Sequence, residues 1–156
     1  MEKKLASVKQ KNNPSTELLL KTAEDFHGHL GPFLVVGVRM GQVGLNELNM
    51  DKKENSLHIF LKVLPNVPYS CIIDGLQVIT KCTVGNQKLQ VEQANDIEAK
   101  FKDLGNGRSV TVAPKPRLLT MLREQMVGKG LSEKDVCKLA WDVASIPEKD
   151  LFIVKR

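Results

Sequence analysis

The sequence has few aromatic residues, few cysteines and no long apolar run, and each shortage excludes a class of protein. One Trp, one Tyr and five Phe in 156 residues leave a core that must be mostly aliphatic. Three cysteines without disulfide-like spacing are typical of reduced thiols and predict a cytoplasmic protein. No stretch is long and apolar enough to cross a bilayer, and Met1–Leu5 lacks the apolar region of a signal peptide.

The charge pattern does not indicate a nucleic-acid partner. The net charge is +5, but the lysines are scattered and no dense Lys/Arg stripe with interleaved aromatics is present. The length suits one domain with its own core, and the 42% hydrophobic content is ordinary for a globular protein. We therefore expect one domain that binds neither nucleic acid nor a membrane.

Two of the three histidines lie two residues apart in the stretch 26–33, Phe-His-Gly-His-Leu-Gly-Pro-Phe. Gly28 and the Gly31–Pro32 pair predict a tight, irregular loop. In extended backbone, residues i and i+2 point the same way with Cα atoms about 6.5 Å apart. His27 and His29 can then face one metal ion, one proton relay or one anion. The alternative is that both imidazoles only hydrogen-bond the loop.

Hydrophobic periodicity and turn residues predict a mixture of helices and strands. Segment 1–14, rich in Lys, Gln and Asn, is expected to be a loose arm, and residues 15–156 are expected to form the domain. Helices are expected from Ser15 or Thr16 to Phe26, from Pro32 onward, over 69–81, and twice within 116–144. Strands are expected at 56–64, 88–93, 97–104, 108–113 and 151–154, with a hairpin turn at Asn106–Gly107.

Three glycines of the second expected helix, Gly37, Gly41 and Gly44, fall on one narrow stripe. Each glycine costs about 1 kcal/mol of helix stability relative to alanine, so something must approach this stripe closely. Tight packing against another helix is the favoured explanation, and a bound ligand is the alternative.

The helix expected over 69–81 has one aliphatic face and one unusual polar face. The polar face carries Cys71, Asp74, Gln77 and Lys81. Cys and Gln beside Asp are less usual than Lys and Glu on a face that only meets solvent.

Four motifs in this order resemble the FmdE family, whose name comes from formylmethanofuran dehydrogenase. They are Phe26 to Pro32, Gly37 to Gly41, Cys71 to Gln77 and Cys82 to Asn86, so the signature spans 26–86 within a resemblance over about 15–115. The resemblance implies an α+β domain with an α-β-α-β-β-β core and a mixed sheet, the fold class of the glyceraldehyde-3-phosphate dehydrogenase catalytic domain. It also implies a homodimer whose signature residues line a cleft able to hold a metal such as zinc.

The sequence departs from the family pattern in two places. Many relatives have Cys-Pro-Gly where this chain has Gly31-Pro32-Phe33, so one potential sulfur ligand is missing. The C-terminal zinc finger of many relatives is also missing, and the expected helices within 116–144 stand in its place. The first departure weakens any mechanism that needs a thiol in the histidine loop.

We interpret the chain as an FmdE-like metal-binding protein linked to molybdenum or tungsten formylmethanofuran dehydrogenase or to related one-carbon redox metabolism. The candidate metal ligands are His27, His29, Cys71 and Cys82, because imidazole nitrogen and thiolate sulfur suit Zn²⁺ at about 2.0–2.3 Å. The candidate catalytic residues are Cys82 and Asp74, and Asp74 could ligate, orient a histidine or act as general base. The residues expected to orient a ligand or to hydrogen-bond a substrate are Gln77, Thr83 and Asn86.

Two other functions stay open, namely a small metal- or cysteine-dependent enzyme of unknown substrate and a structural subunit without catalysis. The expected partners are a second copy of the chain, a small-molecule substrate and subunits of a molybdenum or tungsten enzyme. Cys82, at a helix end beside a glycine turn, is expected to reach a cleft, whereas Cys137 is expected in the core. His58 lies in an ordinary strand pattern and is expected to be structural or exposed.

Overall fold

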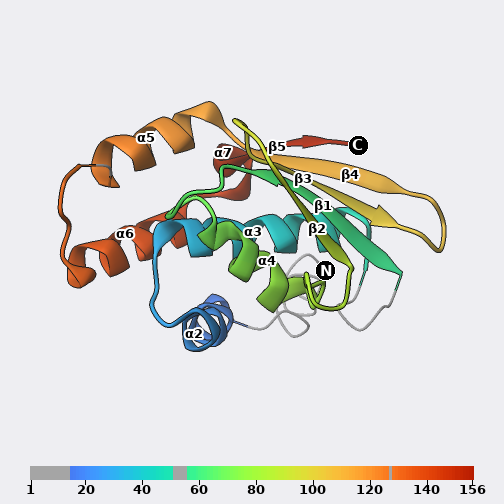
Figure 1. Cartoon of the computed structure of the whole chain (residues 1–156), viewed down its shortest axis with the longest axis horizontal. Coiled ribbons are helices and arrows are strands. Elements are labelled where there is room, and N and C mark those ends of the chain that lie inside the picture. Colours follow the sequence, from blue (N-terminus) through green and yellow to red (C-terminus); the bar gives the residue numbers. More distant parts are fainter. Residues whose placement is uncertain (1–14, 51–55, 127) are drawn as a thin grey trace, which may run out of the picture.

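A mixed five-stranded sheet forms one layer of the protein, and helices cover one of its faces (Figure 1). The computed structural model describes residues 15–50, 56–126 and 128–156, so the expected arm at 1–14 lies outside the described residues. The strand order is β2-β1-β3-β4-β5, in which β1 and β2 are parallel and the other pairs antiparallel. The strands are β1 (Leu57–Val63), β2 (Leu89–Gln93), β3 (Glu98–Asp103), β4 (Ser109–Pro114) and β5 (Phe152–Lys155).

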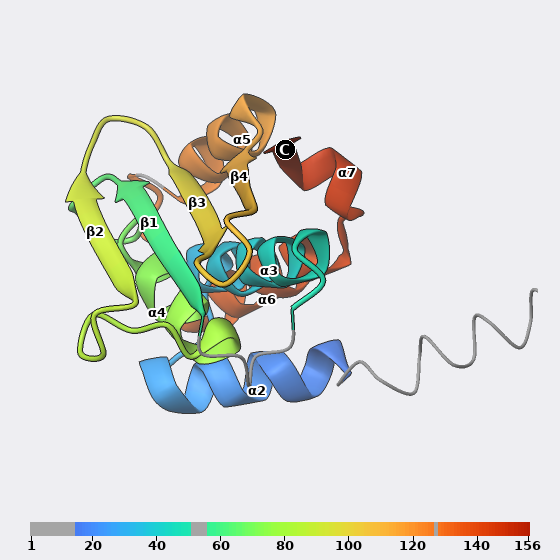
Figure 2. The same ribbon diagram turned by 90° about the vertical axis from the view of Figure 1, so that its right-hand side faces the viewer.

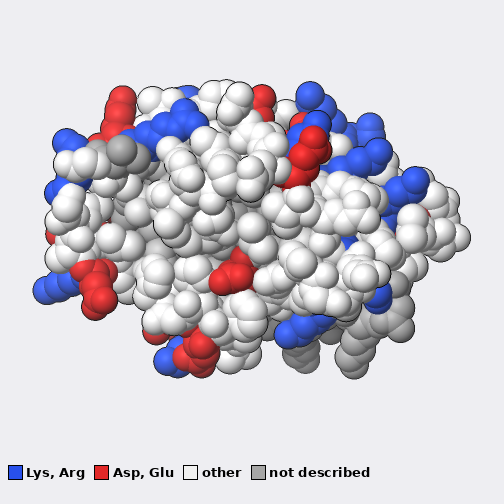
Figure 3. Space-filling view, in the orientation of Figure 1, with Lys and Arg blue, Asp and Glu red and all other residues white. Residues whose placement is uncertain are grey.

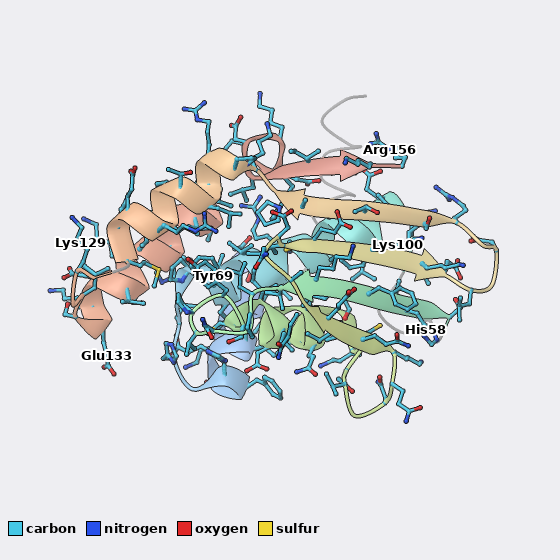
Figure 4. The ribbon with its side chains drawn as sticks, turned by 45° about the horizontal axis from the view of Figure 1, so that its top comes forward. His58, Tyr69, Lys100, Lys129, Glu133 and Arg156 are labelled. Atoms are coloured by element: carbon cyan, nitrogen blue, oxygen red, sulfur yellow. The ribbon has the colours of Figure 1, made fainter. Side chains whose placement is uncertain are left out.

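Alternation along β1 decides which face of the sheet is buried. Its odd-numbered residues, Leu57 to Val63, are buried under the helices, while Phe60 and Lys62 are exposed on the other face. His58 and Lys100 mark the same outer face in Figure 4, where both lie on the side turned to the viewer. The outer location of His58 agrees with the expectation that this residue is structural or exposed.

Six helices complete the described chain, and the largest of them lie together on the inner side of the sheet (Figure 2). Helix α3 is central, because it contacts α2, α4, α6 and the strands β3 and β4. The helices are α2 (Thr16–His27), α3 (Pro32–Glu47), α4 (Cys71–Thr80), α5 (Pro116–Met126), α6 (Glu133–Ser145) and α7 (Glu148–Leu151). The predicted α+β class, the α-β-α-β-β-β core and the added C-terminal helices are therefore confirmed. Within the described residues, no helix is both long and apolar enough to span a membrane.

Helices α3 and α4 pack backbone against backbone through the glycine stripe. A Cβ atom built on Gly37 would overlap the carbonyl oxygen of Ile72, and one built on Gly75 would overlap the carbonyl oxygen of Leu34. Only glycine permits such an approach. Close packing of α4 on Gly37 and Gly41, and of the Phe101 ring on Gly44, therefore explains the stripe without a ligand.

A single arginine of α3 binds the C-terminal end of α6. Arg39 Nη1 donates to the carbonyl oxygens of Val143, Ala144 and Ile146 at 3.3, 3.1 and 2.6 Å. These carbonyls lie where α6 ends. The Val143 carbonyl also accepts from the Ile146 N–H, whereas the guanidinium supplies the donor for the carbonyls of Ala144 and Ile146. Burial lowers the pKa of Arg39, and the negative charge of Glu148 acts in the opposite direction.

Candidate functional site

The candidate site begins where α2 ends. The Ser15 hydroxyl accepts from the Leu18 N–H and caps the start of α2, as predicted. Gly28, with φ +107°, ends the helix, and its N–H donates to the carbonyl of Glu24 at 2.7 Å. His27 is consequently the last residue of α2 and does not lie in the expected extended loop. The His27 and His29 rings nevertheless lie together, with centroids 4.8 Å apart and planes tilted by 45°.

A chain of hydrogen bonds runs from His27 through the polar face of α4. His27 Nδ1 lies 2.6 Å from Oδ2 of Asp74, and the other carboxylate oxygen accepts from Gln77 Nε2 at 3.2 Å. The side-chain amide oxygen of Gln77, Oε1, in turn accepts from the Val84 N–H at 3.0 Å. The structure thus brings together three of the predicted residues and connects α2, α4 and the turn that follows α4.

The contact with Asp74 favours one tautomer of the His27 imidazole. An ionised carboxylate only accepts hydrogen bonds, so Nδ1 of His27 carries the proton that points at Asp74. Nε2 of His27 is then the atom with the available lone pair when the ring is neutral. That atom is fully buried and has no hydrogen-bond partner among the described residues. A buried imidazole nitrogen without a partner is uncommon, and a ligand bound at Nε2 would satisfy it.

Thr83 and Asn86 form a closed turn after α4. The Asn86 side chain accepts from the Thr83 N–H at 3.0 Å and donates to the Lys81 carbonyl at 2.8 Å. The Thr83 hydroxyl accepts from the Asn86 N–H at 3.0 Å. Both side chains therefore hold the turn that carries Val84, and through it they support Gln77.

The two signature thiols do not join the histidines. Cys82 is 2% exposed, and its Sγ donates to the carbonyl of Leu57 at 3.4 Å. Cys71 is 9% exposed; burial raises its pKa, and the negative charge of Asp74 raises it further. Burial also raises the pKa of Cys82. The expectation that Cys82 reaches a cleft is wrong, because the left-handed Lys81 (φ 63°) ends α4 and the next residue enters the core.

No group of three or more His, Cys, Asp or Glu side chains with metal-holding geometry occurs within 15–50, 56–126 and 128–156. The predicted four-ligand set of two histidines and two cysteines is therefore not assembled in this structure. Of the four predicted ligands, the imidazoles of His27 and His29 lie together, and Asp74 orients the His27 ring.

A cavity of about 510 Å³ adjoins the histidine loop where the first half of α6 lies beside it. Its wall includes His29 and Leu30 from the loop, Glu24 from α2, and Glu133, Val136 and Cys137 from α6. The expectation that Cys137 is a core residue is only partly right, because it is half-buried and lines this cavity. Sequence analysis missed the cavity, because no local pattern near residue 137 reports where α6 docks.

Comparisons with known proteins agree with this architecture. The family described as FmdE, molybdenum formylmethanofuran dehydrogenase operon, matches residues 26–153. A protein of Archaeoglobus fulgidus named as a probable S-adenosyl-L-methionine-binding protein is 38% identical over 80 residues, which are 49% of this chain and 22% of that protein. This chain thus spans less than a quarter of the length of that relative.

A solved structure gives the same fold. The crystal structure of a tungsten formylmethanofuran dehydrogenase FmdE-like protein from Syntrophus aciditrophicus superimposes with a TM-score of 0.62 over 92% of this chain and 72% of the other chain. At 18% identity, this similarity concerns the fold alone. The family match covers most of the chain, including the His27–His29 loop, α4 and α6, and the protein therefore belongs to the FmdE family.

Proposed function

We propose that the chain binds a transition metal, zinc first among the candidates, at the His27–His29 loop. We further propose that it serves molybdenum or tungsten formylmethanofuran dehydrogenase systems or related one-carbon redox metabolism, as its family suggests. The observation that carries the metal proposal is the buried Nε2 of His27, which has no partner among the described residues while Asp74 holds Nδ1.

The Asp74–His27 pair has the features of an outer carboxylate and a ligating histidine. A histidine that binds a metal through one nitrogen commonly donates the other ring N–H to a carboxylate, which fixes the tautomer and raises ligand basicity. Asp74 would thus position the ligand without touching the ion, and Gln77 would hold Asp74 through its 3.2 Å hydrogen bond. His29, whose ring lies 4.8 Å from that of His27, is the natural second imidazole.

Metal titration of protein purified without a His-tag and stripped with a chelator tests this proposal. We expect about one equivalent of Zn²⁺ per chain, and a marked loss of affinity in His27→Ala and His29→Ala proteins. His58→Ala is the matched control, because His58 lies on the outer face of the sheet (Figure 4). Binding well below half an equivalent after supplementation, or equal binding by all three variants, would contradict the proposal.

A second candidate is a small enzyme in which His27 acts as a general base. The 2.6 Å contact with Asp74 favours this possibility, because a carboxylate that orients an imidazole is also the arrangement that prepares a general base. The two candidates differ in their dependence on metal. Hydrolysis of simple ester or phosphate substrates that persists in chelator and is lost in His27→Ala would favour the enzyme.

We also propose a homodimer, which the family resemblance implies. The stripe of Gly37, Gly41 and Gly44 is not available as a dimer surface, because α4 and Phe101 cover those glycines. Light scattering that gives the 17.4 kDa mass of one chain at micromolar concentration would contradict the dimer.

A further inference from the structure

The outer face of the sheet carries a group of positive charges that strand pairing brings together. Figure 3 shows Lys and Arg side chains gathered over the strands at the upper right. Because outward residues of paired strands lie side by side, they form rows across the sheet. One row consists of Gln90, Phe60, Lys100, Thr111 and Lys155, one from each strand. The neighbouring row consists of His58, Lys102 and Ser109.

Three lysines of this face have no acidic partner among the described residues. Lys100, Lys102 and Lys155 form no ion pair there, whereas Lys62 pairs with Glu98 at 4.0 Å. From the spacing of strands and of alternate residues, the Cα atom of Lys100 lies about 7 Å from that of Lys102 and about 10 Å from that of Lys155. Three ammonium groups so close together raise the local positive potential and favour an anionic partner.

Phe60 adds an apolar group to the same face. It lies opposite Lys100 in the pairing of β1 with β3, and 39% of its surface is exposed, although phenylalanine is usually buried. Burial of an aromatic ring supplies binding energy at an interface, and the charges around it steer and select the partner. The sequence did not reveal this combination, because its members come from strands far apart in the chain.

The remaining charges of the face discriminate among anionic partners. Glu92 and Glu98 lie on either side of Lys62, one row beyond Lys100, and would repel a phosphate backbone or an anionic membrane laid across β1 and β3. A second copy of the chain is also disfavoured. Lys100 lies near the middle of β3, the middle strand, so a two-fold axis there would set Lys100 against its own copy. A protein surface can carry both signs of charge and match both ends.

We propose that this open face docks an acidic segment of a partner protein. Carboxylates of the partner pair with Lys100, Lys102 and Lys155, and an apolar side chain of the partner covers Phe60. The His27–His29 loop lies among the helices on the inner side of the sheet (Figure 1). The docking surface is therefore separate from the proposed metal site and goes beyond the proposed function.

Fluorescence anisotropy with a short labelled peptide that alternates Glu and Thr around one central Leu tests the proposal. We expect the full chain to bind this peptide in about 50 mM salt and to release it as salt is added, because screening weakens exposed ion pairs. Simultaneous Lys100→Glu, Lys102→Glu and Lys155→Glu substitutions should weaken binding at least about tenfold. Phe60→Thr should also weaken it while retaining a residue that favours strands.

The matched control changes the net charge equally at the opposite end of the molecule. It carries Lys129→Glu, Lys134→Glu and Lys138→Glu, around the start of α6, where Figure 4 labels Lys129. This variant should bind the peptide as the wild type does, and circular dichroism checks the fold of each protein. Equal binding by the two triple variants, or no binding by the wild type in low salt, would overturn the proposal.

Three further measurements separate the other occupants. Tighter binding of oligothymidylate or of phosphatidylglycerol vesicles than of the peptide would overturn the choice of a protein partner. Light scattering that shows a wild-type dimer and a monomer after reversal of the three sheet lysines would assign the face to a second copy and likewise overturn it. Zinc titration should be the same in both triple variants, so failure of the docking proposal leaves the histidine site standing.

Discussion

His27 Nδ1 lies 2.6 Å from Oδ2 of Asp74, although 47 positions separate the two residues in the chain. The contact joins the last residue of α2 to the first turn of α4. It is part-buried, with 12% of the His27 side chain and 33% of the Asp74 side chain exposed. Removal of the Asp74 carboxylate therefore tests whether the orientation that it gives to the His27 ring matters for metal binding.

Asp74→Asn should weaken Zn²⁺ binding by about 10- to 100-fold, the range typical for loss of a group that orients a ligating histidine. The amide keeps the shape of the carboxylate but lacks its charge and presents an N–H at one position. Asp142→Asn is the matched control, because Asp142 is an exposed residue on α6. Competition against a chelating dye measures the affinity, and equal values for the two variants would show that Asp74 does not orient a ligand.

Gly37→Ala should lower the free energy of unfolding by about 1–3 kcal/mol or more, as overpacking of a close contact does. The new methyl group would overlap the carbonyl oxygen of Ile72, and backbone cannot move aside as a flexible side chain does. Gly85→Ala is the control, because a Cβ there meets only the Thr83 hydroxyl, at 3.7 Å. Urea denaturation gives both values; a Gly37→Ala midpoint equal to that of the control would refute the close packing of α3 on α4.

Stability should decline as the pH rises above the ordinary thiol range. Burial raises the pKa of Cys82 and, together with Asp74, that of Cys71, so the folded state keeps both protons after the unfolded chain begins to lose them. The unfolded thiols titrate near about pH 8.5, and the folded state loses its advantage progressively above that value. Urea midpoints at about pH 7.5 and about pH 10 measure the decline.

The Cys82→Ala protein provides the comparison for this pH dependence. It should start less stable at neutral pH, because a buried side chain is truncated, and it should then lose less stability on going to high pH. If stability falls equally with pH in the wild-type and Cys82→Ala proteins, Cys82 does not contribute to the pH dependence.

Arg39→Met should destabilise the protein by about 1–3 kcal/mol, because it removes the side-chain donor from the carbonyls of Ala144 and Ile146 at the end of α6. Methionine preserves much of the aliphatic length, so the loss reports the three hydrogen bonds to Val143, Ala144 and Ile146. Hydrogen exchange should accelerate first in α6. Arg117→Met, at an exposed position of α5, is the control, and the prediction fails if the two variants unfold alike.

Local patterns in the sequence were sufficient for most of the architecture. The alternation in β1, the Ser15 cap and the Asn106–Gly107 turn each depend on a few neighbouring residues, and the observed elements follow them closely. The polar face of α4 also predicted that Asp74 and Gln77 have a purpose beyond solvation, and they form one hydrogen-bonded chain with His27.

The directions of the thiols could not be predicted in the same way. Cys82 turns inward because Lys81 adopts a left-handed conformation, which a non-glycine residue seldom takes and no local pattern announced. Cys137 faces a cavity because of where α6 docks, and Arg39, more than a hundred positions before the end of α6, helps to hold it there. Such placement depends on tertiary packing and not on periodicity.

Because α6 is attached by its C-terminal end, the shape and charge of the cavity can change independently of the Asp74–His27 pair. Arg39 holds the end of α6 at Val143 to Ile146, whereas the cavity is formed by its beginning, around Glu133 to Cys137. Substitutions in that first half can alter the size and charge of the cavity without disturbing the Asp74–His27 pair. Within such a scaffold, paralogues could acquire different ligand preferences through one helix while the signature motifs stay unchanged.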